Sequence, residues 1–198
     1  MYPSSIRNLI ECLKDLPGIG EKSAERLAYA VVGFDNDKLD NFANAIISIK
    51  ENIKKCPVCG CLTDMDKCYI CNDNNRDSDT IFVVEKSKDI ILFEKMGTYN
   101  GKYHVLDGLI SPIDGINPED INLTSLVKRV QDDNVREVIV VLKPSIEGET
   151  TMQYIKKILS KYDVKVSKIP IGIPIGTDIE YIDTMTLEMA FEDRKDVA

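Results

Sequence analysis

The segments CPVC (residues 56–59) and CYIC (residues 68–71) decide how the middle of this chain folds. Each has the C-x2-C spacing that presents two sulfur atoms to one tetrahedral ion, and two such knuckles complete a closed set of four thiolates. The intervening residues 60–67 are short and polar, so the metal must supply the folding energy of this segment. We predict one structural zinc ion per chain, whose ligands are Cys56, Cys59, Cys68 and Cys71. A closed site leaves no open position, so we expect no catalysis at this metal.

A disulfide framework, a rubredoxin-like iron site or a redox dithiol could use the same cysteines. Disulfides persist mainly in oxidising compartments, whereas this chain is expected in the cytoplasm. No apolar run approaches the ~20 residues of a membrane span, and Glu11 and Asp15 interrupt the apolar pattern that a signal peptide would need. Zinc is therefore the favoured interpretation. We expect Cys61 to be a spare thiol and Cys12 to be a small core residue of the first helix.

On the N-terminal side, LPGIG (residues 16–20) separates two amphipathic patterns, at residues 5–15 and about 21–32, and a third helix is expected at about 37–54. The first two helices and this turn have the pattern of a helix-hairpin-helix. Glycines let the turn approach a phosphate, and N–H groups at the start of the second helix point at the anion. We therefore predict a DNA-backbone contact made by Gly18, Gly20, Lys22 and Arg26.

Two other types of turn could place glycines at these positions. An ordinary helix turn with a glycine C-cap would explain the glycines without any ligand. A dinucleotide-binding loop is excluded because Ser23 stands where the third glycine should be and no strand precedes the loop. The chain also has no Walker A sequence, so we expect no nucleotide substrate.

On the C-terminal side, short apolar runs alternate with helical patterns. Such alternation indicates an α/β region with a mainly parallel sheet covered on both faces. The expected strands are residues 81–85, 102–106, 135–142 and 164–169. The expected helices are about 89–95, 122–132 and 150–162, followed by a turn and a short helix within 181–192.

The chain has 198 residues and a formal net charge of −8, which is unfavourable for binding to DNA. Most of the acidity lies in residues 178–198, with seven acidic and two basic side chains, whereas residues 1–55 carry eight of each. A chain-wide basic surface is excluded, and a DNA contact must be local.

Four segments in order resemble the RecR family of recombination mediators. Outside the two cysteine knuckles they are LPGIGEKSAERLA (16–28), YHVLDGLISPIDGINPED (103–120), the strand followed by SIEGET (145–150) and GIPIGTDIEYID (172–183). The knuckles themselves and IFVVE (81–85) also match the family. The resemblance covers nearly the full length, and residues 103–120 are its most specific part. In this segment we expect His104, the single histidine, to be packed and hydrogen-bonded.

The resemblance implies a multidomain α and β fold. The implied parts are a helix-hairpin-helix DNA-binding domain (1–55), a four-cysteine zinc finger (56–71), an α/β Toprim domain with a mainly parallel sheet (79–174), and an acidic C-terminal segment with a short helix (175–198). The C-terminal segment contains a Walker B-like motif at residues 179–183, which is expected to be structural.

Catalytic Toprim enzymes pair a strand-end glutamate with D-x-D-x-x-G, whose carboxylates hold Mg²⁺. Glu85 and Gly148 match this pattern, but Lys143 and Ser145 occupy the two aspartate positions. The family usually has asparagine where Lys143 stands, and Gly-Gly near residues 176–177. A lysine repels the cation, so we expect no metal-assisted strand cleavage. The remaining acidic residues form a candidate partner or regulatory surface, with a solvated loop as the alternative: Glu85, Glu147 and Glu149.

The implied function is that of a non-enzymatic, DNA-binding recombination mediator in the repair of damaged DNA. Such proteins bind single- and double-stranded DNA as a ring or clamp of two to four chains. With RecO, and with RecF in many bacteria, they load RecA onto single strands. The alternatives are a Mg²⁺-dependent Toprim nuclease or primase-like enzyme, and a zinc-ribbon adaptor that binds only protein.

Overall fold

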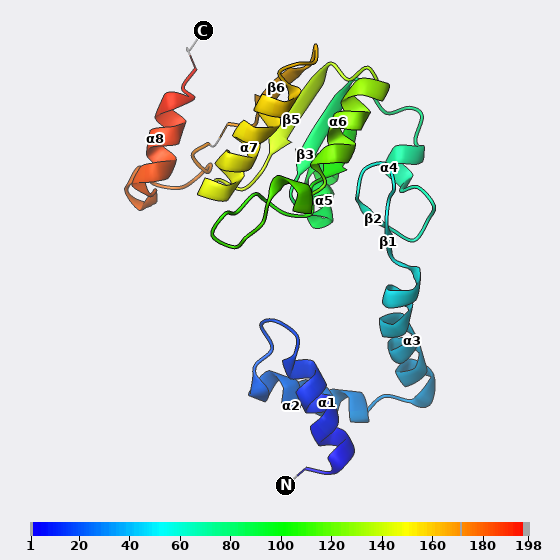
Figure 1. Ribbon diagram of the computed structural model, residues 1–198. Helices are drawn as coiled ribbons and strands as arrows, with labels where there is room; N and C mark the ends of the chain where they lie inside the picture. The colour runs from blue at the N-terminus through cyan, green and yellow to red at the C-terminus, as the bar shows by residue number, and fades with distance from the viewer. Residues whose placement is uncertain (1, 171, 196–198) are drawn as a thin grey trace. The chain divides into compact units, whose positions relative to one another are not determined.

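The computed structural model describes residues 2–170 and 172–195, and the chain divides into two compact units, residues 1–53 and 54–198 (Figure 1). The ranges expected for the domains also include Met1, Ile171 and residues 196–198, which lie outside the described residues. No helix in the described ranges combines the length and apolar character needed to cross a bilayer.

The first unit contains three helices, α1 (Ser4–Lys14), α2 (Glu21–Val32) and α3 (Asn36–Asn52). Helices α1 and α2 pack through Ile10 and two fully buried alanines, Ala24 and Ala28, whose small side chains permit close approach. The first and last residues of these three helices agree with the ranges predicted from the sequence to within two residues. The prediction that Cys12 is a small core residue was wrong, because Cys12 is exposed. Helix α3 has no buried residue.

The second unit begins with the cysteine knuckles. Strands β1 (Lys54–Lys55) and β2 (Leu62–Thr63) pair antiparallel, and the one-turn helix α4 (Tyr69–Asn72) starts directly after Cys68. The positive φ of Gly60, 75°, turns the first knuckle, and a Cβ there would lie 3.0 Å from the carbonyl oxygen of Val105. A glycine is therefore required where the knuckle meets the sheet.

Four parallel strands form the sheet in the order β4-β3-β5-β6. Strands β3, β5 and β6 are labelled in Figure 1. Their bounds are β3 (Thr80–Val84), β4 (Lys102–Val105), β5 (Glu137–Val141) and β6 (Lys165–Lys168). The helices between them are α5 (Ser87–Met96), α6 (Leu123–Asp132) and α7 (Ile146–Leu159), and α8 (Thr184–Glu192) follows. Short 3-10 turns lie at Pro118–Asp120 and Ile179–Tyr181. The predicted mixed fold with a mainly parallel sheet is confirmed.

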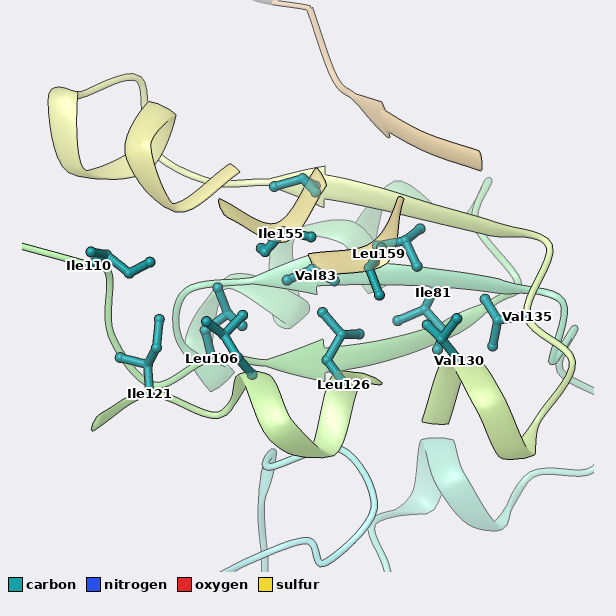
Figure 2. Packing of buried hydrophobic residues seen from close by; sticks show 13 residues of the cluster. Ile81, Val83, Leu106, Ile110, Ile121, Leu126, Val130, Val135, Ile155 and Leu159 are labelled. Atoms are coloured by element: carbon teal, nitrogen blue, oxygen red, sulfur yellow. The ribbon is translucent and has the colours of Figure 1, made fainter. Parts of the chain in front are cut away.

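The two faces of the sheet belong to different apolar clusters because side chains alternate along each strand. On one face, Ile81 and Val83 pack with Leu126 of α6 and Ile155 of α7 (Figure 2). On the other face, Phe82, Val84 and Tyr103 pack with Ile90 and with cysteines of the knuckles. The apolar knuckle surface therefore shares a core with the parallel sheet.

Helix α7 begins earlier than predicted. The sequence pattern placed residues 145–149 in a loop, whereas the helix starts at Ile146 with Ser145 as its N-cap. The Ser145 hydroxyl accepts a hydrogen bond from the Gly148 N–H at 3.2 Å, which satisfies one of the helix's free donors. Glu147 and Glu149 consequently lie in the first turn of α7 and not in a loop.

Candidate functional site

The four predicted ligand cysteines converge at one point. Their Sγ atoms all lie within 4.8 Å of one another, and the Sγ atoms of Cys59 and Cys68 are 3.5 Å apart. That distance is too long for a disulfide, which requires about 2.05 Å. Four sulfurs around a tetrahedral zinc ion, each about 2.3 Å from the metal, would lie about 3.8 Å from one another. The donor set and its spacing therefore fit a metal ion that takes four thiolates.

Backbone N–H groups support two of these sulfurs. The N–H of Cys61 donates to Cys59 Sγ at 3.4 Å, and the N–H of Cys68 donates to Cys56 Sγ at 3.5 Å. Hydrogen bonds from neighbouring thiols, Cys59 first, lower the pKa of Cys68, whereas those from Cys61 and its neighbours raise the pKa of Cys59. Buried thiolates side by side repel one another, so a dication is needed to keep all four deprotonated.

Cys61 is buried beside this group but is not part of the four-ligand set. Its Sγ donates to the carbonyl oxygen of Leu62 at 3.4 Å. Its backbone N–H donates to Cys59 Sγ, and its thiol lies next to the cluster without belonging to the ligand set.

The glycine turn does not cap α1. That helix ends at Lys14 with Asp15 as its C-cap, and the following turn is closed by a hydrogen bond from the Ile19 N–H to the Leu16 carbonyl at 3.2 Å. Gly18 adopts a φ of 82°, which L residues rarely tolerate. The alternative of a simple glycine C-cap at this helix end is therefore not what the backbone forms.

Gly20 is the N-cap of α2 and offers no side chain to the first N–H groups of that helix. A Cβ on Gly20 would meet no atom within 4 Å, so packing within the chain does not require glycine here. Lys22 and Arg26 are exposed one turn apart on α2, and neither has an ion-pair partner in the described part of the chain. Open donors and Lys22 thus share the first turn of α2 with the carboxylate of Glu21, and Arg26 lies one turn further along the same helix.

The three acidic residues of the Toprim region lie at or near strand ends. Glu85 directly follows β3, and its Oε1 lies 3.4 Å from Lys86 Nζ. Glu147 accepts a hydrogen bond from the Ser145 hydroxyl at 2.7 Å, which lowers the pKa of its carboxyl group. In residues 2–170 and 172–195, the four cysteines are the one group of three or more side chains placed to share a metal. The carboxylates Glu85, Glu147 and Glu149 do not form such a group.

The prediction that His104 is packed and hydrogen-bonded is confirmed. His104 is fully buried, its Nε2 lies 2.7 Å from the Asn122 carbonyl oxygen, and burial lowers its pKa to about 4. Arg129, which sequence reasoning did not single out, is also buried, with 8% of its surface exposed. A signal was available, because Arg129 follows Leu126 by three residues and therefore lies within the apolar stripe of α6.

The fold and the cysteine cluster define a class of multidomain Toprim protein with an N-terminal helix-hairpin-helix and four cysteines placed to hold a metal ion. Three family models match successive parts of the chain. The model described as "Toprim domain" matches residues 79–170, "RecR, helix-hairpin-helix" matches residues 6–50, and "RecR, C-terminal" matches residues 172–195.

The chain belongs to the RecR family. Membership supports a role as a recombination mediator that binds DNA and forms an oligomeric assembly.

Proposed function

We propose that the protein is a non-enzymatic recombination mediator that contacts DNA phosphates through the glycine turn and the start of α2. The observation that carries this proposal is the combination at Gly20, Lys22 and Arg26: uncapped N–H groups, open space at the N-cap and two exposed, unpaired cations. Contacts of this type read the backbone and not the bases, which suits a protein that acts on DNA of any sequence.

We further propose zinc as the metal of the cysteine cluster, with Cys56, Cys59, Cys68 and Cys71 as its ligands. Zinc would supply folding energy to the knuckles, whose apolar side shares a core with the sheet. With its four positions filled by protein, this metal would have no role in catalysis.

The proposed assembly is a ring or clamp of two to four chains around single- or double-stranded DNA. One hairpin has little net charge, so tight binding requires several hairpins on one DNA, where each further contact becomes intramolecular. RecO, and RecF where present, are the proposed partners in loading RecA. The candidate surface for such a partner comprises Glu85, Glu147 and Glu149.

The second candidate is a Mg²⁺-dependent Toprim nuclease or primase-like enzyme. The presence of the Toprim fold is the observation in its favour. Against it, Lys143 and Ser145 stand at the positions of two metal-holding aspartates, and the nearby carboxylates are not gathered around a common point. We therefore expect no nicking, relaxation or priming of DNA with Mg²⁺ or Mn²⁺, and cleavage that disappears in Glu85→Ala would favour the enzyme.

The salt dependence of DNA binding tests the main proposal. Each lost phosphate contact should lower the slope of log affinity against log salt by roughly 0.7 to 0.9. Because several chains share one DNA, Lys22→Ala/Arg26→Ala should flatten the slope by several such steps, about equally for all sequences. The matched control is Lys156→Ala/Lys157→Ala, which removes two exposed lysines of α7.

Gly20→Ala provides a second arm. Its methyl group has room within the chain, so the melting temperature should change little, while DNA binding should weaken because the methyl stands between the α2 N-terminus and a phosphate. If the double variant keeps the wild-type slope both alone and with RecO, the DNA contact lies elsewhere on the protein.

A further inference from the structure

A cleft of about 450 Å³ lies beside the cysteine knuckles in the second unit, and none of its lining residues is among those proposed above for DNA or partner binding. Cys71 and Val58 of the knuckles form part of its wall. The polar groups that line it come from the knuckles, the following loop, β4 and α6: Lys67, Asn74, Arg76, Ser78, Lys102 and Arg129. Four of these six side chains are cationic, and Asp133 is the carboxylate in the lining.

Arg129 is the least expected member of this wall, because it is buried with an incomplete set of partners. Its Nη1 donates to the Tyr103 carbonyl oxygen at 2.7 Å. Its Nε is buried without a hydrogen-bond partner, and Asp133 Oδ2 lies 3.6 Å away, beyond hydrogen-bond distance. Nη2 also makes no hydrogen bond in the described part of the chain. Unlike Nε, Nη2 is not among the buried atoms that lack a partner, so this nitrogen keeps donors that a ligand in the cleft can use.

Two of the other cations are already occupied. Arg76 Nη1 donates to Glu94 Oε1 at 2.9 Å, and Lys102 Nζ donates to the carbonyl oxygens of Ile70 and Asp73. These hydrogen bonds hold the Arg76 and Lys102 side chains in place in the wall of the cleft.

The remaining polar side chains of the wall are free to act on a ligand. Lys67 Nζ, the Asn74 amide and the Ser78 hydroxyl make no side-chain hydrogen bond within residues 2–170 and 172–195, and all three residues are exposed. Together with Arg129 Nη2 they offer hydrogen-bond donors from three separate segments. These donors outnumber the hydrogen bonds that the Asp133 carboxylate can accept.

The chemistry of these donors selects the ligand. When zinc fills the cysteine cluster, the ion and its four thiolates together carry a net charge of about −2. Because Cys71 belongs both to this cluster and to the cleft wall, net charge alone does not attract an anion to the cleft. Selection must come from directed donors, and a phosphate group offers several acceptor oxygens for a guanidinium, an ammonium and a hydroxyl at once. We propose that this cleft binds a phosphate group, held by Arg129 and Lys67 with support from Asn74 and Ser78.

Inorganic phosphate is the first probe, titrated calorimetrically into the full-length, zinc-loaded protein. Saturable binding is expected, and Lys67→Gln should weaken it about tenfold because one charge-assisted hydrogen bond is lost. Lys157→Gln, an exposed lysine of α7 outside the cleft, is the matched control and should bind as the wild type does.

Arg129→Lys should abolish binding, because an ammonium cannot replace the guanidinium fork. That variant can also lose stability through the lost bond to Tyr103, so Ser78→Ala, an exposed change, accompanies it and should weaken binding several-fold.

A second arm identifies the source of the phosphate. In the Lys22→Ala/Arg26→Ala background, oligonucleotides with and without a 5′-phosphate are compared. A preference for the 5′-phosphorylated strand that Lys67→Gln removes assigns a DNA end, and equal weakening of both strands assigns backbone phosphates. Binding of inorganic phosphate alone assigns a small phosphate ligand.

The inference is independent of the proposed hairpin function, since the hairpin variant should still bind phosphate. Absence of saturable phosphate binding by the wild type would overturn it. Equal effects of Lys67→Gln and Lys157→Gln on phosphate affinity would do the same.

Discussion

His104 is a buried neutral imidazole whose pKa is lowered to about 4, chiefly by burial. Its ordinary value is about 6.5, so the unfolded chain takes up a proton on acidification that the folded chain does not. Stability contributed by the neutral form is therefore present above the unfolded pKa and is lost as pH falls toward the folded pKa. The loss from about pH 7.5 to about pH 5.5 should be about 1.4 kcal/mol.

The measurement for His104 is the free energy of unfolding in urea at those two pH values. His104→Gln keeps a donor for the Asn122 carbonyl oxygen but does not titrate. The variant should therefore lose about 1.4 kcal/mol less unfolding free energy on acidification than the wild type does. Zinc release in acid affects both proteins, so the difference between them isolates the histidine. Equal losses would contradict the assignment.

The cysteines allow a residue-by-residue test of the metal cluster. Cys56→Ser removes one proposed ligand, so it should lose zinc and become poorly soluble, because binding energies on the order of 10 kcal/mol support structural zinc sites. Cys61→Ser lies beside the cluster but outside the ligand set and should keep one zinc per chain. Elemental analysis of the purified variants decides; zinc retained in Cys56→Ser/Cys71→Ser would refute the proposed ligands.

At the scale of single elements, the start of α7 depends on Gly148. A Cβ at this position would lie 2.1 Å from the Lys143 carbonyl oxygen, a backbone atom that cannot move freely. Gly148→Ala should therefore destabilise the protein by about 1 to 3 kcal/mol, the usual range for an overpacked site. Gly172→Ala is the control, because a Cβ there meets no atom within 4 Å. Thermal unfolding monitored by circular dichroism would show the difference, and equal melting temperatures would refute it.

Most elements could be predicted because apolar periodicity decides their type. The start of α7 was predicted too late in the chain because the Ser145 hydroxyl caps the helix by accepting a hydrogen bond from the Gly148 N–H. The periodicity of apolar residues does not reveal such a contact. Helix α3 was recognised correctly, yet the burial of its apolar side could not be derived from one chain. The cysteine cluster could be predicted from spacing alone, whereas the cleft at Arg129 depends on contacts between distant segments.

At the scale of the whole molecule, the exposed apolar side chains of α3 lead us to predict that the protein self-associates. Ile46 and Ile49 lie on one side of this helix and are 56% and 61% exposed. Burying such side chains against another chain is favourable by about 25 cal/mol per Å² of apolar surface. We expect a multiple of the single-chain mass by light scattering, consistent with the oligomeric assembly that family membership supports.

The variant for this prediction is Ile46→Asp/Ile49→Asp, which should lower the mass and leave the sheet's unfolding transition unchanged. Asn44→Asp adds a charge on the opposite side of α3 and serves as the control. An unchanged mass in the double variant would place the self-association surface elsewhere.

The position of β3 between β4 and β5 has a kinetic consequence. Thr80 pairs with Glu137, so the central ladder closes a long loop, whereas the two knuckles close over short stretches of chain. Local closure is fast, and parallel pairing across distant segments is slow. During refolding with Co²⁺ as a visible substitute for zinc, metal–thiolate absorbance should therefore rise before the far-ultraviolet signal of the sheet. The knuckles would then form an apolar surface before the sheet is complete, and Phe82 and Tyr103 would pack against that surface as the strands pair.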